Sequence, residues 1–535
     1  MGADPIVIFG ACLYFAAIIA IGWFTRSAAA DATDFYVAGR KIGPFINGSA
    51  LAATYFSPAT FLGMPAFIFM ISYPFWWTLS GIIAGMPVAT LLTAAPMRKY
   101  APTSFTDYYA DRYDTKWMRL ACSLPTIVGG FAYVILSIVG TALSMVAILK
   151  VSYLVSVILA AAVVFIYIFW GGMVATTFST ALQGVIMTVA TLIAAAVIIA
   201  HYGGLTGLTD AAISSNALYF MTPHANPKTS HPLMGMWTGM VGFYFIWHYG
   251  FATMPYTVVR FFTAQDIKAA RRSVTWAIIV GGAMYVGLIV IGTSAKVLIE
   301  QSHPLMGTEG IKNAVGVLAH MKKTYAIGTA SVTDYSMFAI TESLKMPWLM
   351  AWIVAGGLSI AMSTAAGWTM VLNVVLGRDL IGKVFGSKWP DEKPVQVMRV
   401  MTFAVIFISG ILSIDPPALV LDISGSAFLV IICATAPALV LGIWWDRSTK
   451  AAAYVTIVVM TFVTGGSWLY AFYVQKSPHW FFLSDPANKI PTPHQFYWIP
   501  IAFLLFIVVS LMTKPPRKEV IQKYCLDIRP EQPKK

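Results

Sequence analysis

The feature that most constrains this chain is a series of long apolar runs separated by polar loops. About twenty residues are needed for a helix to cross the hydrocarbon core of a bilayer. Backbone groups in lipid must bond within their own segment, and these runs lack the alternation of barrel strands. We therefore predict an all-α integral membrane protein with about 13 transmembrane helices. The predicted segments are 4–25, 45–70, 74–96, 117–148, 152–170, 176–201, 234–262, 273–298, 346–377, 396–413, 417–444, 450–474 and 495–513.

The distribution of positive charge predicts how these helices are oriented. The chain is 58% hydrophobic and 11% charged, and its net charge of +13 resides in short loops and the tail, so no nucleic-acid partner is expected. With an external N-terminus, 26 of the 35 Lys and Arg residues face the cytoplasm. We expect a cell-membrane protein with a cytoplasmic C-terminus. The long loops 202–233 and 299–345 are then external, and we expect them to act as lids.

The second apolar segment contains a proline that should interrupt its helix in mid-membrane. Pro58 removes a backbone donor, and Ser57 before it has the order of a cap at a new helix start. Such a restart frees carbonyls for a cation and amides for an anion. The nearby Thr54, Tyr55 and Thr60, with Ser57, are candidate substrate-binding residues. The alternative interpretation is a simple proline kink.

A second interruption lies five segments later, between Gly250 and Pro255. Broken helices at corresponding positions of two halves are typical of inverted-repeat transporters with a site at the midplane. His248 and Tyr249 flank this break and are candidate donors to a carboxylate, although packed aromatic positions would explain them equally well. Arg260 should lie where the helix leaves the membrane, with its side chain extended to the cytoplasmic surface.

Three further polar features need interpretation. Ser363 and Thr364 can bring two hydroxyl oxygens to one point, as a hard cation requires, or can bond back to their own helix. Asp422 is either a gating or proton-carrying group or an acid in a first helical turn, and we favour the latter. The basic stretch 264–273 is either a surface helix or a plain loop.

Several motifs together resemble the sodium:solute symporter family, and most closely its cation:acetate branch. They extend over residues 30 to 380, and beyond 450 the resemblance rests on hydropathy. The matching stretches are Asp34–Lys41, Gly48–Ala53, Phe61–Met64, Trp170–Thr177, Pro255–Asp266, Ala269–Val274 and Met362–Gly367.

The resemblance implies a LeuT-like core of two inverted five-helix repeats. The division is 1–44 for the first helix and cytoplasmic loop, 45–201 and 234–444 for the repeats, 202–233 for the external loop between them, 445–513 for two peripheral helices and 514–535 for a basic cytoplasmic tail. The family's sodium site uses carbonyls of the first core helix and a carbonyl and two hydroxyls of the eighth. Aligned without gaps, these ligands fall on Ala53, Phe56, Ile360, Ser363 and Thr364.

From these features we expect a symporter that couples Na⁺ entry to uptake of a small monocarboxylate such as acetate. Ala59 and Thr60 replace the amide and acidic side chains of sugar transporters, which argues against a sugar. Several relatives carry an acid near a second cation site where this chain has Thr180, so one sodium per cycle is expected. Proton coupling, a neutral or amino-acid solute and, less favoured, a membrane-embedded acyl- or lipid-transfer enzyme remain alternatives. The oligomeric state stays open.

Overall fold

The computed structural model describes residues 4–25, 37–71, 74–169, 172–215, 237–308, 310–327, 333–416, 420–473, 481–485 and 490–530. The prediction of an all-α membrane fold is confirmed, and each of the thirteen apolar segments coincides with a helix or an interrupted helix. These helices are α1 (Pro5–Thr25), α3 (Pro44–Tyr55) with α4 (Met64–Ile71), α5 (Pro74–Ala89) with α6 (Ala95–Tyr100), α8 (Trp117–Leu149), α9 (Tyr153–Phe169), α10 (Gly172–His201), α12 (Trp237–Thr253) with α13 (Pro255–Thr263), α14 (Ile267–Ser302), α17 (Pro347–Asn373), α19 (Pro394–Leu412), α20 (Val420–Trp444), α21 (Lys450–Tyr473) and α22 (His494–Met512).

Shorter elements connect or extend these helices. The helical ones are α7 (Phe105–Arg112), α11 (Leu205–Ser215), α15 (Ala314–Tyr325), α16 (Ser336–Ser343), α18 (Trp389–Glu392), α23 (Lys518–Ile521), the 3-10 turns η2 (Ala38–Arg40) and η5 (Thr333–Tyr335), and the π segments η3 (Ala59–Gly63), η4 (Thr90–Ala94), η6 (Val374–Val384) and η7 (Gln522–Leu526). The strands β1 (Phe481–Asp485) and β2 (Ile490–Pro493) form an antiparallel hairpin between α21 and α22.

Length and apolar composition agree with a chain that crosses a membrane many times. In the described ranges eight helices meet both criteria, and nine do so when the bent pair Pro44–Tyr55 and Ala59–Phe69 counts as one span. Shorter apolar helices within α1, α9 and α22 and the interrupted pair α12 and α13 account for the other predicted segments.

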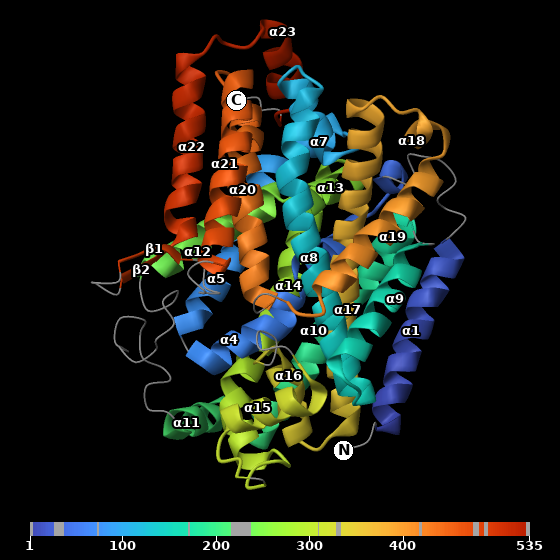
Figure 1. Cartoon of the computed structure of the whole chain (residues 1–535), viewed down its shortest axis with the longest axis vertical. Helices are drawn as coiled ribbons and strands as arrows, with labels where there is room; N and C mark the ends of the chain where they lie inside the picture. Colours follow the sequence, from blue (N-terminus) through green and yellow to red (C-terminus); the bar gives the residue numbers. More distant parts are fainter. Residues whose placement is uncertain are drawn as a thin grey trace.

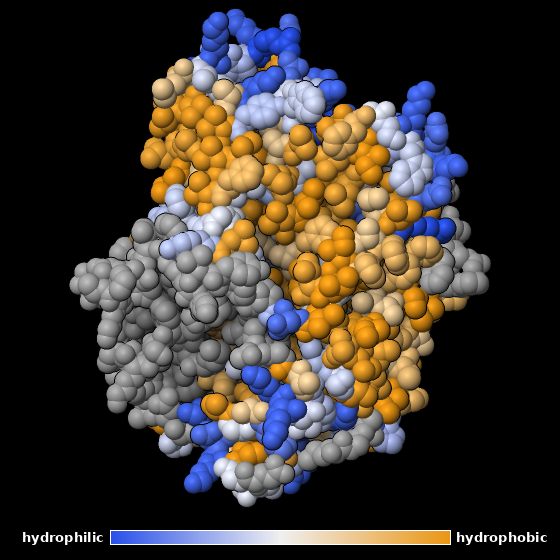
Figure 2. All heavy atoms as spheres, viewed as in Figure 1, coloured by the Kyte–Doolittle hydropathy of each residue, from blue (hydrophilic) through white to orange (hydrophobic). Residues whose placement is uncertain are grey.

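The arrangement in space agrees with this interpretation. In Figure 1 the long helices lie along the longest axis, with α11, α15 and α16 at the lower end and α18 and α23 at the upper end. Hydrophobic side chains cover the visible middle of the molecule, and hydrophilic ones gather toward the two ends (Figure 2). The external role of α11, α15 and α16 as lids stays a prediction, and residues 216–236 of the first external loop lie outside the described part.

Small residues let neighbouring helices approach the broken helix α3 closely. A Cβ atom at Gly140 of α8 would lie 2.7 Å from the Cβ atom of Pro58, and one at Gly184 of α10 would lie 2.6 Å from the carbonyl oxygen of Ser49. Helices in membranes associate through such backbone contacts, since hydrophobic burial offers little there. The segment that carries the break is therefore held between α8, α10, α14 and α17.

The stretch 264–273 differs from one of its two sequence-based interpretations. The stretch 264–273 forms no separate surface helix: Asp266 caps α14 by accepting the Ala269 amide at 2.6 Å, and α14 runs on from Ile267. Just before it, the Ile42 amide donates to Thr263 at 3.1 Å, and the Gln265 amide donates to Ile42 at 3.1 Å. These bonds fasten the chain entering α3 to the end of α13.

The C-terminal tail folds back onto the end of α20. The Cys525 thiol donates to the Ile443 carbonyl at 3.1 Å, and Arg529 donates to the same carbonyl at 2.8 Å and to the Asp446 carboxylate at 2.7 Å. Cys525, which its polar surroundings in the sequence would leave accessible, is therefore fully buried.

Candidate functional site

The predicted break in α3 opens carbonyl groups near the middle of the molecule. The helix ends at Tyr55, Phe56 is extended with φ −73° and ψ 115°, and the following helix leaves at an angle of 59°. The Ser57 carbonyl accepts the amides of Thr60 at 2.7 Å and Phe61 at 3.2 Å, so Ser57 starts the second half through its backbone. The break is thus a true interruption and not a simple kink.

The five groups of the predicted cation site lie together where α17 passes this break. The Ser363 hydroxyl lies 2.8 Å from the Ala53 carbonyl oxygen and 3.0 Å from that of Ile360. The Thr364 hydroxyl lies 3.3 Å from the Phe56 carbonyl oxygen and 2.8 Å from that of Ile360. All five residues are fully buried. Each hydroxyl therefore bonds to its own helix and also lies against the end of α3. This combines the two interpretations, a bond back to the same helix and a pair of oxygens turned toward one point.

The chemistry of this donor set suits a hard monovalent cation. Carbonyl and hydroxyl oxygens are ligands for hard cations, whereas soft or divalent ions favour sites with thiolates, imidazoles or carboxylates. In the described ranges the structure has no cluster of three His, Cys, Asp or Glu side chains that could hold a metal ion. Assignment of these five residues to sodium stays a prediction.

Beside the break, six helices contribute aromatic rings to one cluster, which we call the aromatic cluster. Tyr55 packs against Phe251 with ring centroids 4.6 Å apart, and Trp368 stacks on Tyr133 at 5.0 Å. The cluster comprises Tyr55 of α3, Tyr133 of α8, Trp247 and Phe251 of α12, Tyr256 of α13, Trp368 of α17 and Phe428 of α20. Its members come from both broken helices and the helices around them.

Two hydrogen-bond donors in the aromatic cluster lack acceptors. The Tyr256 hydroxyl and the Trp368 indole nitrogen are buried without a hydrogen-bond partner in the described structure, and their rings lie 4.9 Å apart. A buried polar group left unpaired costs about 1–3 kcal/mol, so such groups indicate a missing partner. Indole can only donate, and a tyrosine hydroxyl readily does. The missing partner that fits both groups is a hydrogen-bond acceptor.

The structure divides the predicted substrate residues into two groups. Thr54, Tyr55, Ser57 and Thr60 are buried at or beside the break, and the Thr54 hydroxyl accepts a bond from Arg260 at 3.1 Å. His248 and Tyr249, in contrast, face away from it.

The positions of His248 and Tyr249 have a local explanation. His248 stacks on Tyr244 and bonds that residue's carbonyl at 2.7 Å, whereas Tyr249 packs on Phe503 of α22 with centroids 4.8 Å apart. The neighbours Trp247 and Phe251 occupy the face of α12 that looks toward Tyr55. These contacts favour the alternative of packed aromatic positions, and a substrate-binding role of His248 and Tyr249 stays an untested prediction.

Arg260 differs from its prediction. Its guanidinium does not extend to the cytoplasmic surface but is 2% exposed and donates to Thr177 at 2.8 Å and to Thr54 at 3.1 Å. The side chain turns inward because the backbone carbonyl of Arg260 accepts from Asn47 of α3 at 2.9 Å and is fixed there.

Thr180, the residue on which the expected stoichiometry depends, is fully buried. The side chain of Asp422 lies outside the described part.

Sequence reasoning missed most of the aromatic cluster. Trp247 and Phe251 are four residues apart on α12, and Trp368 is four residues after Thr364 on α17, so each pair shares one helix face. That spacing was a usable signal for Trp368. Tyr133 and Phe428 lie on uninterrupted helices, where nothing in the sequence distinguishes them from ordinary membrane-helix aromatics.

Buried ion pairs lie on both sides of the site. In α16, before α17, Glu342 pairs with Lys150, the residue just after α8, and lies 3.3 Å from His303. Although burial raises the pKa of Glu342, His303 and Lys150 outweigh it and hold that pKa below its usual value. Near α7, Asp107 pairs with Arg119 and lies 3.2 Å from Arg378 beyond α17. These clusters join elements that flank the site at its two ends.

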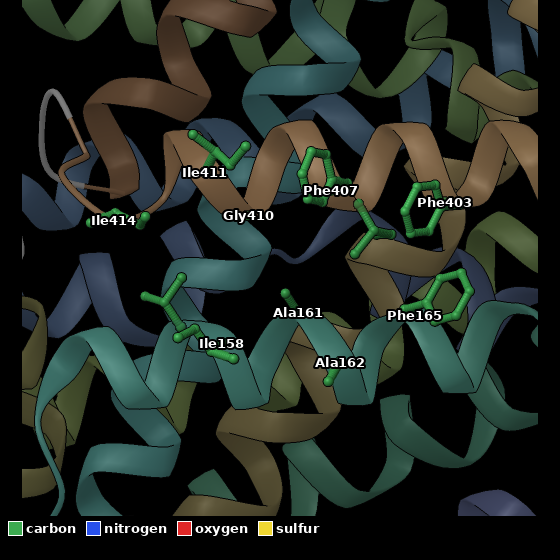
Figure 3. A pocket seen from close by; sticks show the side chains of 11 residues that line it. Ile158, Ala161, Ala162, Phe165, Phe403, Phe407, Gly410, Ile411 and Ile414 are labelled. Carbon is green, nitrogen blue, oxygen red and sulfur yellow. The ribbon is translucent and has the colours of Figure 1, made fainter.

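A prominent groove elsewhere has a different character. It lies between α9 and α19, and its lining includes Ile158, Ala161, Phe165, Phe403 and Phe407 (Figure 3). All of its lining residues are apolar or glycine, and the labelled side chains of the two helices approach each other across it. Because it offers no polar group, it cannot orient a charged or polar solute.

We compared the chain with known families, curated proteins and solved structures. The family description "Sodium:solute symporter family" matches residues 35–459. The osmoregulated proline transporter OpuE of Bacillus subtilis (strain 168) is 24% identical over 460 residues, covering 84% of this chain and 85% of that protein. A Na⁺-coupled sialic acid symporter, solved in a substrate-bound outward-open state, superposes with TM-score 0.73 at 16% identity over 96% of this chain and 99% of that chain. This likeness shows the fold, a LeuT-like core.

Proposed function

Since this chain belongs to the sodium:solute symporter family and Na⁺ is its coupling ion, we propose that the solute it carries with sodium is a small monocarboxylate such as acetate. Transport follows from alternating access to the site beside the two breaks, with no covalent step. Sodium is proposed to bind Ala53, Phe56, Ile360, Ser363 and Thr364.

The observation that carries the proposal is the pair of unpartnered donors in the aromatic cluster. A carboxylate only accepts hydrogen bonds, so it can satisfy the Tyr256 hydroxyl and the Trp368 indole together. Bonds from neutral donors to a charged acceptor contribute about 1.5–3 kcal/mol each. The apolar rings beside these donors would pack against a short apolar tail.

An amino acid is the alternative substrate. The relative OpuE is named a proline transporter, and proline carries an ammonium group as well as a carboxylate. A buried ammonium needs an anionic or carbonyl partner. In the described ranges no carboxylate forms a hydrogen bond with Tyr55 or Tyr256 of the aromatic cluster, whereas carbonyl oxygens lie at both breaks. The two unpartnered donors favour a negatively charged substrate, and exchange with proline tests whether the carbonyl oxygens also accept an ammonium group.

Counterflow in proteoliposomes tests the substrate and the ion together. Labelled acetate should exchange in sodium medium but not in lithium or choline medium. Unlabelled acetate should compete, whereas acetamide and proline should not, because the amide loses the charge-assisted bond. Equal competition by acetamide would favour a neutral solute, and proline exchange would favour an amino acid. Exchange that follows a proton gradient without sodium would support the proton-coupled alternative.

Single-atom variants connect the assay to the structure. Tyr256→Phe removes only the unpartnered hydroxyl and should raise the acetate concentration for half-maximal exchange roughly tenfold, corresponding to about 1.4 kcal/mol. Tyr454→Phe is the matched control, because its hydroxyl lies 3.4 Å from Thr115 and far along the chain from either break. If Tyr256→Phe exchanges acetate with unchanged affinity, the aromatic cluster does not bind the carboxylate.

A further inference from the structure

Arg260 is a charged residue that neither the sodium site nor the aromatic cluster uses. It lies five residues beyond Pro255 on α13, after the second break, and its side chain is fully buried. Its guanidinium donates to Thr177 of α10 at 2.8 Å and to Thr54 of α3 at 3.1 Å. It therefore joins α13 to α10 and α3 beside the first break.

No described side chain neutralises the positive charge of Arg260. Within the described ranges it forms no ion pair, and both side-chain acceptors of its hydrogen bonds are neutral hydroxyls. Each hydroxyl donates to its own helix, Thr54 to Ala50 and Thr177 to Met173, both at 2.7 Å, and so turns its lone pairs toward the guanidinium. A buried charge without a counter-ion is costly.

Several other buried charges in the described ranges have ionic partners, although Arg112 of α7 and Asp334 also lack one. Asp107 is paired with Arg119 and Arg378, and Glu342 with Lys150. An arginine left without an acid, at a position next to the breaks, is suited to receive an anion that comes and goes. The planar guanidinium matches a carboxylate in two parallel hydrogen bonds.

The position of Arg260 also relates it to the cation site. Thr54, which accepts its bond, follows Ala53, whose carbonyl lies 2.8 Å from Ser363. A cation held by Ala53 and Ser363 would thus have a fixed positive charge nearby in a region of low dielectric. An anion on Arg260 removes that repulsion, and its departure restores it.

We propose that Arg260, with the hydroxyls of Thr54 and Thr177, forms a carboxylate-binding subsite on the cytoplasmic side of the breaks, which the transported anion occupies between the aromatic cluster and its release. This inference rests on the proposed monocarboxylate function. It adds a physical basis for coupling: sodium and anion bind cooperatively because each offsets the electrostatic cost that the other meets beside Arg260. When the anion leaves, the guanidinium favours release of sodium.

The test is Arg260→Gln, measured in purified protein by sodium-induced thermal stabilisation and by acetate exchange from the cytoplasmic side in oriented vesicles. The variant should need at least tenfold more acetate for half-maximal exchange. In the absence of acetate it should need less sodium for half-maximal stabilisation, because the repelling charge is gone. If Arg260 had a purely structural role, the variant would instead bind both acetate and sodium more weakly.

A matched control and a second variant complete the design. Arg98→Gln removes a charge from the same region, where Arg98 donates to the carbonyls of Ala264 and Gln265 just after α13, and should leave both affinities unchanged. Arg260→Lys keeps the charge but not the planar fork. It should weaken acetate binding several-fold with sodium binding unaltered, which gives a result even if the glutamine variant does not fold.

The outcomes separate the two proposals. If the wild-type protein exchanges acetate and Arg260→Gln or Arg260→Lys does so with unchanged affinity, the subsite is wrong while the proposed function stands. A loss of sodium affinity in Arg260→Gln equal to the loss of acetate affinity would also overturn it. If the wild-type protein exchanges no monocarboxylate at all, the proposed function fails and the subsite fails with it.

Discussion

Ser363→Ala is the sharpest test of the cation site, because it removes one proposed ligand oxygen and little else. The Ser363 hydroxyl is fully buried, 2.8 Å from the Ala53 carbonyl and 3.0 Å from that of Ile360. Its loss takes away one of five oxygens and leaves the Ala53 carbonyl without its partner. Loss of a bond to a charged group costs about 1.5–3 kcal/mol, or roughly 10- to 150-fold in sodium affinity.

The assay is acetate exchange in proteoliposomes as a function of sodium concentration, together with sodium-induced thermal stabilisation of the purified protein. Ser359→Ala is the matched control, since Ser359 lies one turn earlier on α17 and is equally buried. Thr364→Ala should act like Ser363→Ala, whereas Thr364→Ser, which keeps the oxygen, should retain most of the sodium affinity. Wild-type sodium dependence in both alanine variants would refute the assignment.

Three other predictions follow from the topology, the charge balance and one buried acid. Because Cys525 is buried, the orientation of the tail is better tested with a cysteine in place of the exposed Lys518. An impermeant thiol reagent should label this cysteine only after cells are opened. Labelling of sealed cells would contradict a cytoplasmic tail. With Thr180 neutral and one sodium accompanying one monocarboxylate, acetate uptake should respond little to an inside-negative potassium-valinomycin potential, and strong stimulation would indicate a second cation. Burial raises the pKa of Asp334, between α15 and α16, to about 8 despite a bond from the Val420 amide. The native state therefore holds a proton that the unfolded state releases near pH 4. The free energy of unfolding should fall as the pH rises from about 4 to 8. Asp334→Asn should flatten that fall and raise the Tm at pH 8, as thermal unfolding across the pH range would show; a parallel pH profile in the variant would contradict it.

The parts of the fold that follow from local chemistry were predictable. Pro58 and Pro255 each remove a backbone donor, and both helices break there. The position of Ser363 and Thr364 on α17 fixes the direction of their hydroxyls. The gap-free alignment with the family therefore predicted their contact with the end of α3. These are short-range constraints, which a sequence expresses directly.

The parts that depend on helix rotation were not predictable. His248 and Tyr249 are next to Trp247 in the chain, but rotation of α12 by about 100° per residue decides which of them meets Tyr55. Arg260 was expected at the surface because its distance from Pro255 fits the membrane boundary. Its inward direction depends on the contact of α13 with α3 and α10, which no local pattern reports.

The docked tail sets an order of events during synthesis. Residues 518–529 are synthesised after α21 and α22, because those helices separate the tail from its partners along the chain. The bonds from Cys525 and Arg529 to Ile443 are therefore among the last to form. A protein whose final two helices fail to insert would leave this basic segment undocked, so the protease sensitivity of the last residues reports whether assembly has been completed.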